Sequence, residues 1–192
     1  MANFRSKRKN KAKIYLILII VLIAVAIMLF FKTDMFRNQF YPKKYSEYVS
    51  EFSEKYNVDE DFIYAVIKTE SGFDASAVSD VGARGLMQMM QDTFDWVQFR
   101  LDEQRNITYD DMFVPQYSIE YGTYMLSYLY EKYGSYELVS AAYHSGAGRV
   151  DSWISDGVID TENVVIDDIP SDITRHYINK IMNAYKSYKN LY

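Results

Sequence analysis

An uninterrupted apolar run from Ile14 to Phe31 constrains this chain more than any other feature, because it divides the chain into two parts that must fold in different surroundings. The run contains eighteen residues without a charge. As a helix it would be about 27 Å long, which is just enough to cross the hydrocarbon core of a bilayer. A buried helix of a soluble protein is disfavoured, since nothing polar interrupts its faces. We therefore expect residues 14–31 to form a single transmembrane helix.

The residues before this run are strongly basic. The first thirteen positions contain no acidic residue and six basic ones, namely Arg5, Lys7, Arg8, Lys9, Lys11 and Lys13. Positive charge stays on the cytoplasmic side of a membrane protein, so we expect residues 1–13 to form a cytoplasmic tail and the remainder to lie outside the cytoplasm. A cleaved signal peptide is the alternative, but small residues would then follow the apolar run. The bulky side chains at 30–36 favour an uncleaved signal anchor in the cell membrane.

Charge and composition exclude several classes of function. Removing the six N-terminal positive charges from the formal net charge of −5 leaves −11 for the residues beyond position 13. Nucleic-acid ligands require a basic surface, so this acidic part argues against them. The absence of cysteine excludes disulfides, thiolate nucleophiles and cysteine-based metal sites. The only histidines are His144 and His176, which argues against a metal centre, and we expect neither a metal nor another cofactor.

The part beyond the apolar run reads as one mainly α-helical domain. Residues 32–42 form a short polar and aromatic linker, and residues 43–192 form the domain. Apolar residues at helical spacing predict helices over 43–56, 59–71, 86–101, 119–133, 137–143 and 177–188. We expect Asp59 to be the N-cap of the second of these helices and Gly134 to end the fourth. Turn-forming and polar residues predict irregular connections over 73–85, 106–115 and 151–171. We find no convincing pair of strands.

Glu70 places a carboxylate in the apolar stripe of a short predicted helix. Ile63, Val66 and Ile67 precede it at intervals of seven, four and three residues, so all four share one helix face, and Gly72 ends the helix. Apolar surroundings and a helix C-terminus both disfavour the charged form, which raises the pKa of a carboxyl group. A carboxylic acid that stays protonated near neutral pH can act as a general acid. The alternative is a surface glutamate whose carboxylate reaches water at the helix end.

Two further segments are weak signals when each is taken alone. Residues 82–88 place two glycines and a glutamine at the entrance of a predicted helix, without the Gly-Lys-Ser/Thr sequence of a phosphate-binding loop. Residues 141–146 end a helix with aromatic and polar groups, and Ser145 lacks the flanking pattern of a nucleophile elbow. Their order along the chain after Glu70 is more informative than either segment alone.

Taken in order, four motifs resemble those of the lytic transglycosylase family, and in particular its Slt-type catalytic domain with a lysozyme-like fold. The motifs are Glu70-Ser71, Gly85-Leu86-Met87-Gln88, Ala142-Tyr143 and Tyr177. The resemblance extends from about Tyr45 to Tyr188, which is nearly the whole domain. It implies an enzyme that acts on peptidoglycan strands and cuts the β-1,4 bond between N-acetylmuramic acid and N-acetylglucosamine.

The resemblance also implies a mechanism with one essential glutamate, whereas most glycosidases use two carboxylates. Glu70 would first protonate the departing glycosidic oxygen. As a carboxylate, it would then take the proton of the C6 hydroxyl of the muramyl residue. The C6 oxygen would bond to C1 of that residue and give a 1,6-anhydromuramyl end. The product forms without water.

The remaining site residues follow from the same resemblance. Ser79 would hydrogen-bond near the catalytic carboxyl or the acetamido group, Met87 and Gln88 would line the sugar groove, and Tyr143 and Tyr177 would hold the glutamate and the muramyl ring. The complete set expected to bind substrate is Ser79, Gly85, Leu86, Met87, Gln88, Tyr143, His144 and Tyr177.

Three positions depart from the family pattern. His144 stands where the family usually has asparagine, which would change the contacts to substrate amides. Ile173 replaces a common glutamate, with Asp172 beside it as a substitute, and Gln91 replaces a frequent proline. None of these departures removes the catalytic acid.

Two alternative functions remain open at the level of sequence. One is a hydrolase of the same fold, in which Asp74, Asp80 or Asp172 positions a water molecule as the base. The other is a non-catalytic peptidoglycan-binding module that anchors an envelope machine, such as a secretion apparatus. An intact Glu70 motif argues against simple binding, because binding alone does not require a buried acid.

Overall fold

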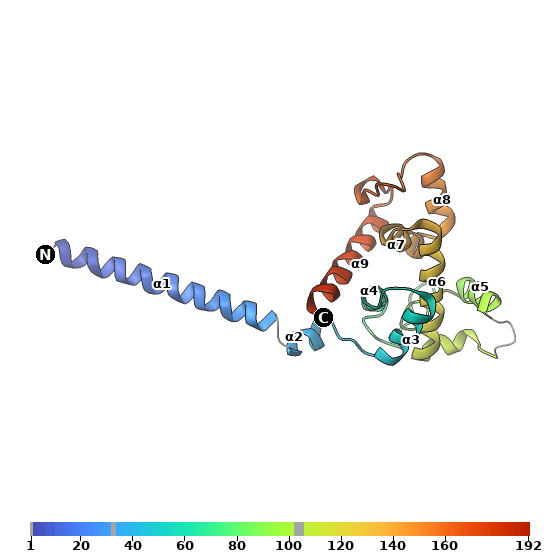
Figure 1. Ribbon diagram of the computed structural model, residues 1–192, viewed down its shortest axis with the longest axis horizontal. Coiled ribbons are helices and arrows are strands. Elements are labelled where there is room, and N and C mark those ends of the chain that lie inside the picture. The colour runs from blue at the N-terminus through green and yellow to red at the C-terminus, as the bar shows by residue number, and fades with distance from the viewer. Residues whose placement is uncertain (1, 32–33, 102–105) are drawn as a thin grey trace. The chain divides into compact units, whose positions relative to one another are not determined.

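The computed structural model describes residues 2–31, 34–101 and 106–192, and it divides between Pro42 and Lys43 into two compact units (Figure 1). The described residues are mainly helical, and their only β-bridges are isolated ones, Val78 with Arg84 and Arg84 with Met89. The mainly α fold predicted from the helical periodicity is therefore confirmed.

The N-terminal unit contains two helices, α1 (Ala2–Phe31) and α2 (Asp34–Phe40). Among the described residues, α1 contains the only stretch long and apolar enough to cross a membrane, Lys13–Phe30. The predicted linker is thus helical over most of its length. The Phe36 and Phe40 rings, one helical turn apart, lie 4.9 Å from each other between centroids, a spacing that favours this short helix.

The second unit is built around α4 (Glu60–Glu70), which follows α3 (Ser46–Tyr56). Asp59 caps α4 as predicted, because its carboxylate accepts a hydrogen bond from the backbone N–H of Asp61 at 2.9 Å. Six consecutive residues, 62–67, are buried. The helix is therefore enclosed on nearly all sides rather than along one stripe.

The helix predicted from Leu86 begins five residues later, as α5 (Gln91–Leu101). Gly85 and Gln88 adopt left-handed backbone conformations, with φ of 76° and 47°, which a continuous α-helix does not accommodate. Leu86 and Met87 are fully buried within this turn. Burial in a compact turn explains why these apolar positions resembled the start of a helix.

The next elements are the short 3₁₀ helix η1 (Tyr109–Phe113), which lies within a predicted connection, and three α-helices. These are α6 (Pro115–Tyr133), α7 (Tyr136–Ser145) and α8 (Ala147–Ser155). The α6 helix ends at Gly134 as predicted and contacts α3, α5, η1 and α7. Residues 151–155 were expected to be irregular but belong to α8, so that prediction is wrong there.

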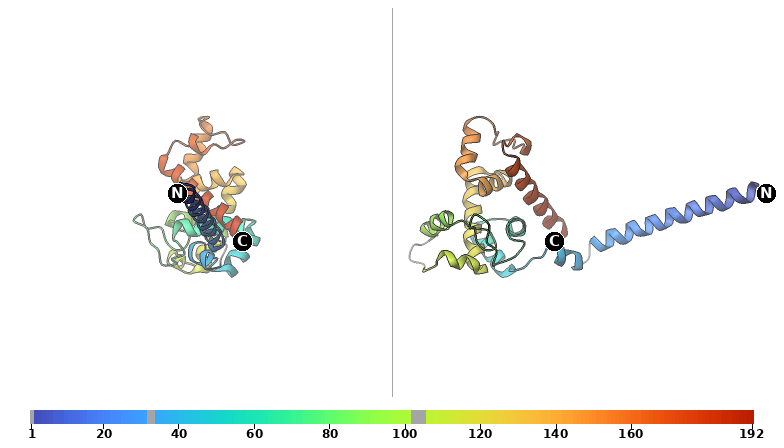
Figure 2. Two further views of the ribbon diagram at one scale, coloured as in Figure 1. Left: turned by 90° about the vertical axis from the view of Figure 1, so that its left-hand side faces the viewer. Right: turned by 180° about the vertical axis from the view of Figure 1, so that it is seen from behind.

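The chain closes with a second 3₁₀ turn, η2 (Ile166–Asp168), and the long helix α9 (Asp172–Leu191). Ser171 caps α9 by accepting a hydrogen bond from the Thr174 N–H, so the helix begins five residues before the predicted start at Tyr177. Tyr185 of α9 packs edge-on against Phe62 of α4 and Tyr136 of α7. These contacts hold α9 beside α4 and α7, as Figures 1 and 2 show.

Candidate active site

Glu70 is the last residue of α4, and its side chain is half-buried. The hydroxyl of Tyr177, on α9, donates a hydrogen bond to Oε1 of Glu70. One turn later on α9, Nζ of Lys180 donates to the backbone carbonyl of Thr69 at 3.3 Å. The structure thus brings together two residues that the family motifs singled out, Glu70 and Tyr177, and adds a lysine that the motifs do not contain.

Burial raises the pKa of the Glu70 carboxyl, while the Tyr177 hydrogen bond and the Lys180 charge lower it, and the net direction is upward. The raised pKa expected from the sequence is therefore confirmed in direction. A carboxyl group in this environment can hold a proton at a higher pH than an exposed glutamate, and it can still lose that proton.

Two phenolic hydroxyls flank this carboxyl. Burial, followed by the negative charge of Glu70, raises the pKa of both Tyr143 and Tyr177 well above the ordinary value, so both remain hydrogen-bond donors. The Tyr143 hydroxyl donates to the carbonyl oxygen of Met87 at 2.7 Å. Tyr143 therefore fastens α7 to the turn after Gly85, whereas Tyr177 contacts the carboxylate itself.

His144 covers the outer side of Tyr177. The two rings are stacked, with 4.4 Å between centroids and 18° between planes. Partial burial and, secondarily, the Arg149 charge lower the pKa of the His144 imidazole, which favours its neutral form. The structure therefore shows His144 supporting Tyr177, and contact with substrate stays a prediction.

Gly85 is required for close packing at the turn between α4 and α5. A Cβ at this position would lie 1.8 Å from the carbonyl oxygen of Met112 and 2.9 Å from Oγ of Ser118. Ser118 also accepts a hydrogen bond from the Met87 N–H at 3.2 Å. The glycine thus lets the turn approach η1 and α6, which is a structural role, and its contact with a sugar stays a prediction.

Leu86 and Met87 are core residues, each with 0% exposure. A Cβ on Gly122 would lie 2.3 Å from the Met87 sulfur, which shows how closely Met87 packs against α6. The prediction that the Met87 side chain lines an open groove is therefore wrong, and Leu86 likewise presents no exposed side chain to a ligand. Both residues instead contribute backbone hydrogen bonds to the site. The Leu86 carbonyl oxygen accepts one from Ser71 Oγ at 2.8 Å, and the Met87 carbonyl oxygen accepts the one from Tyr143.

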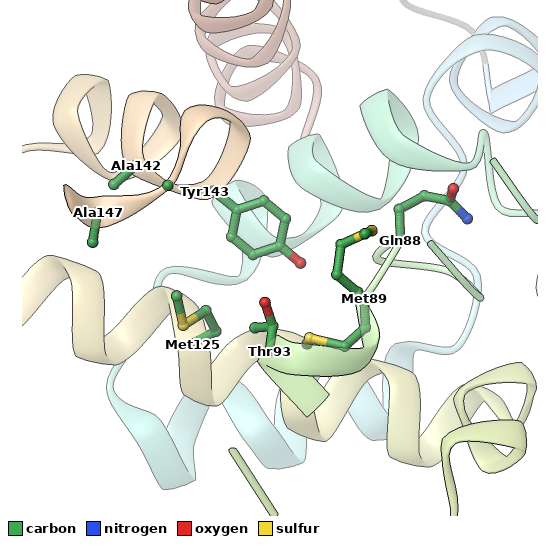
Figure 3. Close-up of a pocket in the computed structure, with 9 residues that line it drawn as sticks. Gln88, Met89, Thr93, Met125, Ala142, Tyr143 and Ala147 are labelled. Atoms are coloured by element: carbon green, nitrogen blue, oxygen red, sulfur yellow. The ribbon is translucent and has the colours of Figure 1, made fainter. Parts of the chain in front are cut away.

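Gln88 has both a structural role and a position on the surface of the site. Its amide nitrogen donates to the carbonyl oxygens of Ala77 at 3.1 Å and Gly85 at 3.0 Å, which fixes the turn. The residue also lines a pocket of about 220 Å³ beside Tyr143. Figure 3 shows this pocket, whose lining is Gln88, Met89, Met90, Thr93, Met125, Ala142, Tyr143, Gly146 and Ala147.

Several of these lining residues were missed by sequence reasoning. Thr93 lies on α5 and Met125 on α6, within helices whose apolar pattern predicts only packing. Ala147 begins α8, where no helix was expected. The pocket is formed where these elements converge, so no single segment contains its signature.

Ser79 lies in a turn rather than at the carboxyl group. Its hydroxyl accepts a hydrogen bond from the Ala83 N–H at 3.0 Å, and no hydrogen bond among the described residues joins it to Glu70. The prediction that Ser79 hydrogen-bonds near the carboxyl is not realised in this structure, and contact with an acetamido group stays a prediction. Ser71 is the serine that positions the end of α4.

No second carboxylate hydrogen-bonds Glu70 within the described part of the chain. Asp74 accepts from the Ser76 N–H at 2.9 Å, Asp172 pairs with Arg175, and the side chain of Ile173 is 73% exposed. Across residues 2–31, 34–101 and 106–192, no three His, Cys, Asp or Glu side chains gather as metal ligands would. Among the described residues, the side chains that act on the Glu70 carboxyl are Tyr177, through its hydrogen bond, and Lys180, through its charge.

Comparison with known proteins identifies similar domains. The model of the family described as transglycosylase SLT domain matches residues 47–162. The soluble lytic murein transglycosylase of Salmonella typhimurium is 30% identical over 153 residues, covering 77% of this chain and 23% of that protein. The membrane-bound lytic murein transglycosylase C of Serratia proteamaculans is 34% identical over 167 residues, covering 76% of this chain and 47% of that protein.

A solved structure resembles the fold as well. An inactive mutant of lytic transglycosylase Slt from Pseudomonas aeruginosa matches with a TM-score of 0.72 and 27% identity, over 80% of this chain and 25% of that one. The chain thus spans about a quarter of the soluble relatives and about half of the membrane-bound one.

Proposed function

Because this chain belongs to the transglycosylase SLT domain family, we propose that it is a peptidoglycan lytic transglycosylase. Its substrate would be the β-1,4 bond between N-acetylmuramic acid and N-acetylglucosamine. The observation that carries the proposal is the Glu70 carboxyl, half-buried at the end of α4 and hydrogen-bonded by Tyr177. Tyr143, whose pKa is raised by burial and by the Glu70 charge, also lines a pocket that supplies a concave surface for a ligand.

In the first step, protonated Glu70 donates its proton to the glycosidic oxygen as the bond from that oxygen to C1 breaks. The upward pKa shift caused by burial supports this role, because it maintains a protonated fraction. Tyr177 then stabilises the resulting carboxylate through its hydrogen bond. The leaving strand departs with a free hydroxyl.

In the second step, the Glu70 carboxylate accepts the proton of the muramyl C6 hydroxyl while that oxygen bonds to C1. The products are a 1,6-anhydromuramyl end and Glu70 returned to its protonated form. No water enters and no second base is needed. The raised pKa of Glu70 and its hydrogen bond from Tyr177 support a route in which this one group acts first as acid and then as base.

We further propose that α1 anchors the chain in the cell membrane with residues 1–13 in the cytoplasm and residues 43–192 outside it. The length and apolar character of Lys13–Phe30 and the six basic residues support this orientation. The similar Serratia protein is named as membrane-bound. A short connection over residues 32–42 would confine cutting to wall close to the membrane, where an envelope machine could use the opening.

The proposal is tested by digesting purified peptidoglycan with the full-length chain in detergent micelles and identifying the products by mass spectrometry. Anhydro-ended muropeptides, lighter than the hydrolytic products by one water, are expected from the parent chain and absent with Glu70→Gln. Reducing ends would indicate the hydrolase instead. No release by a folded chain would leave the wall-binding module as the better account.

A further inference from the structure

A second groove, of about 430 Å³, lies between the end of α3, α5 and α6, apart from the residues around Glu70. We call it the aromatic groove, and its principal lining residues are Lys55, Tyr56, Arg100, Tyr124, Ser127 and Tyr128. The mechanism proposed above uses none of them. Its lining combines phenol rings, two cations, one carboxylate and uncharged polar groups, whereas the lining of the pocket beside Tyr143 includes three methionines.

The rings in and beside the aromatic groove form a connected row. Tyr56 meets Tyr124 edge-on at 5.5 Å between centroids, Tyr124 lies 6.3 Å from Trp96, and Trp96 meets Tyr128 at 4.7 Å. All four side chains are only partly buried. Such a row gives a ligand flat apolar faces with polar edges, which suits the apolar faces and hydroxyl rims of sugar rings.

The cations of the aromatic groove lie against these rings. The Arg100 guanidinium is 4.8 Å from the Trp96 centroid and 5.8 Å from that of Tyr128. Lys55 is 4.9 Å from the Tyr56 centroid, but it also pairs with buried Glu120 at 2.9 Å, so Arg100 supplies more of the local positive charge. The Arg100 guanidinium can pair with a carboxylate of a ligand, whereas the Glu131 carboxylate in the same lining opposes that pairing.

The aromatic groove and the pocket beside Tyr143 border the same two helices. On α5, Thr93 lines the pocket and Arg100 lines the groove, seven residues and about 10 Å further along one helix face. On α6, Met125 lines the pocket, and its neighbour Tyr124 lines the groove. A single extended polymer following α5 and α6 can therefore contact both.

We propose that the aromatic groove binds a stretch of peptidoglycan strand remote from the bond that is cut. Sugar rings stack on Tyr124 and Tyr128, and a carboxylate of the muramyl lactyl group or stem peptide meets Arg100. This inference rests on the proposed function, since it takes the same polymer as the ligand. Binding at the aromatic groove would make the enzyme prefer long strands over short fragments.

The test uses Trp96 as a reporter. The chain has two tryptophans, so Trp153→Phe leaves Trp96 as the only one. The full-length chain with Trp153→Phe and Glu70→Gln, in detergent micelles, is titrated with long uncrosslinked glycan strands while Trp96 fluorescence is followed. Arg100→Gln and Tyr128→Ala are each expected to weaken binding about tenfold, equivalent to about 1.4 kcal/mol. Glu131→Gln, which removes a negative charge from the lining, is the matched control and should tighten it.

A second readout uses the chain with an active Glu70. Arg100→Gln and Tyr128→Ala should lower the ratio of kcat/KM for long strands to kcat/KM for a tetrasaccharide fragment by about tenfold. Circular dichroism establishes that each variant is folded. Two results would reject strand binding at the aromatic groove while leaving the proposed function intact. In the first, folded variants bind long strands as tightly as the parent does. In the second, Trp96 fluorescence does not change when strands that the parent cleaves are added.

The opposite combination is equally informative. A strand-dependent Trp96 signal that Arg100→Gln weakens, in a chain that cleaves no peptidoglycan, would uphold binding at the aromatic groove and reject the catalytic proposal. Loss of thermal stability in the variants without any loss of strand binding would mean that the rings serve packing alone, and would also overturn the inference.

Discussion

Tyr177 donates a hydrogen bond to Oε1 of Glu70 across a separation of 107 residues, joining the last helix to the end of the buried helix α4. This bond opposes the effect of burial, because it stabilises the charged carboxylate. Together, burial and the bond hold Glu70 in a state from which a proton can leave and to which it can return.

Replacing Tyr177 by phenylalanine should impair both the release of the Glu70 proton and its return. The variant retains the ring that stacks with His144 but loses the donor, so the pKa of Glu70 rises further and the carboxylate loses its restraint. We expect kcat to fall about tenfold to a hundredfold and the alkaline limb of the pH–rate profile to move to higher pH. An unchanged profile would show that the hydrogen bond does not act on the catalytic proton.

The Glu70→Gln substitution should stabilise the fold while removing activity. A carboxyl whose folded pKa lies above its unfolded value binds more protons when folded, so its contribution to stability falls as pH rises from about 4.5. At neutral pH, Glu70→Gln should therefore raise Tm by about 3 °C, and the gain should disappear below pH 4.5. Calorimetry across this range checks the sign, and a lower Tm at neutral pH would contradict it.

Lys180 provides a separate test of the charge on Glu70. Its ammonium lowers the pKa of the carboxyl, so Lys180→Gln should raise that pKa and extend activity to higher pH. Lys180→Arg should preserve the parent profile. Lys186→Gln on the exposed side of the same helix is the matched control, and a shift of equal size there would attribute the effect to net charge alone.

His144 should act through Tyr177. His144→Ala removes the ring stacked at 4.4 Å and is expected to lower kcat by up to about tenfold, whereas His144→Phe keeps a flat ring and should retain most of the rate. The comparison is made on soluble strands at saturating concentration. Equal losses in both variants would indicate that the imidazole contacts substrate directly.

Gly85 should be intolerant of any side chain. Gly85→Ala drives a Cβ into the Met112 carbonyl and should destabilise the fold by about 3 kcal/mol or more, as measured by urea unfolding. Gly82 is the control, because it also has a left-handed backbone, with φ of 87°, but has open space around its Cβ position. Gly82→Ala should cost only about 1 kcal/mol. Equal costs would attribute the requirement at Gly85 to backbone conformation alone.

The sequence pattern predicted the helix caps, helix ends and amphipathic faces that depend on residues close together in the chain. Asp59 as the cap of α4, Gly134 as the end of α6 and the amphipathic helix around Tyr177 are confirmed. The Slt-type, lysozyme-like fold suggested by the motifs is also confirmed by the likeness to a solved Slt structure.

The errors arose where distant contacts override local preference. The turn at 85–88 exists because Met112 and Ser118 meet the backbone there, yet in sequence its apolar residues resemble a helix start. Met87 belongs to the core because it packs against Gly122, thirty-five residues away. The pairing of Glu70 with Tyr177 is equally invisible to periodicity, and only the resemblance brought both residues into one site.

The most direct test of the central claim, that Glu70 serves as acid and then as base for the sugar's own hydroxyl, is isotopic. Peptidoglycan is digested by the full-length chain in water enriched in oxygen-18, and the new muramyl ends are weighed by mass spectrometry. The account predicts anhydro ends without the heavy isotope, absent with Glu70→Gln. Reducing ends that carry oxygen-18 at C1 would contradict it, because a water molecule would then have attacked where the C6 hydroxyl should.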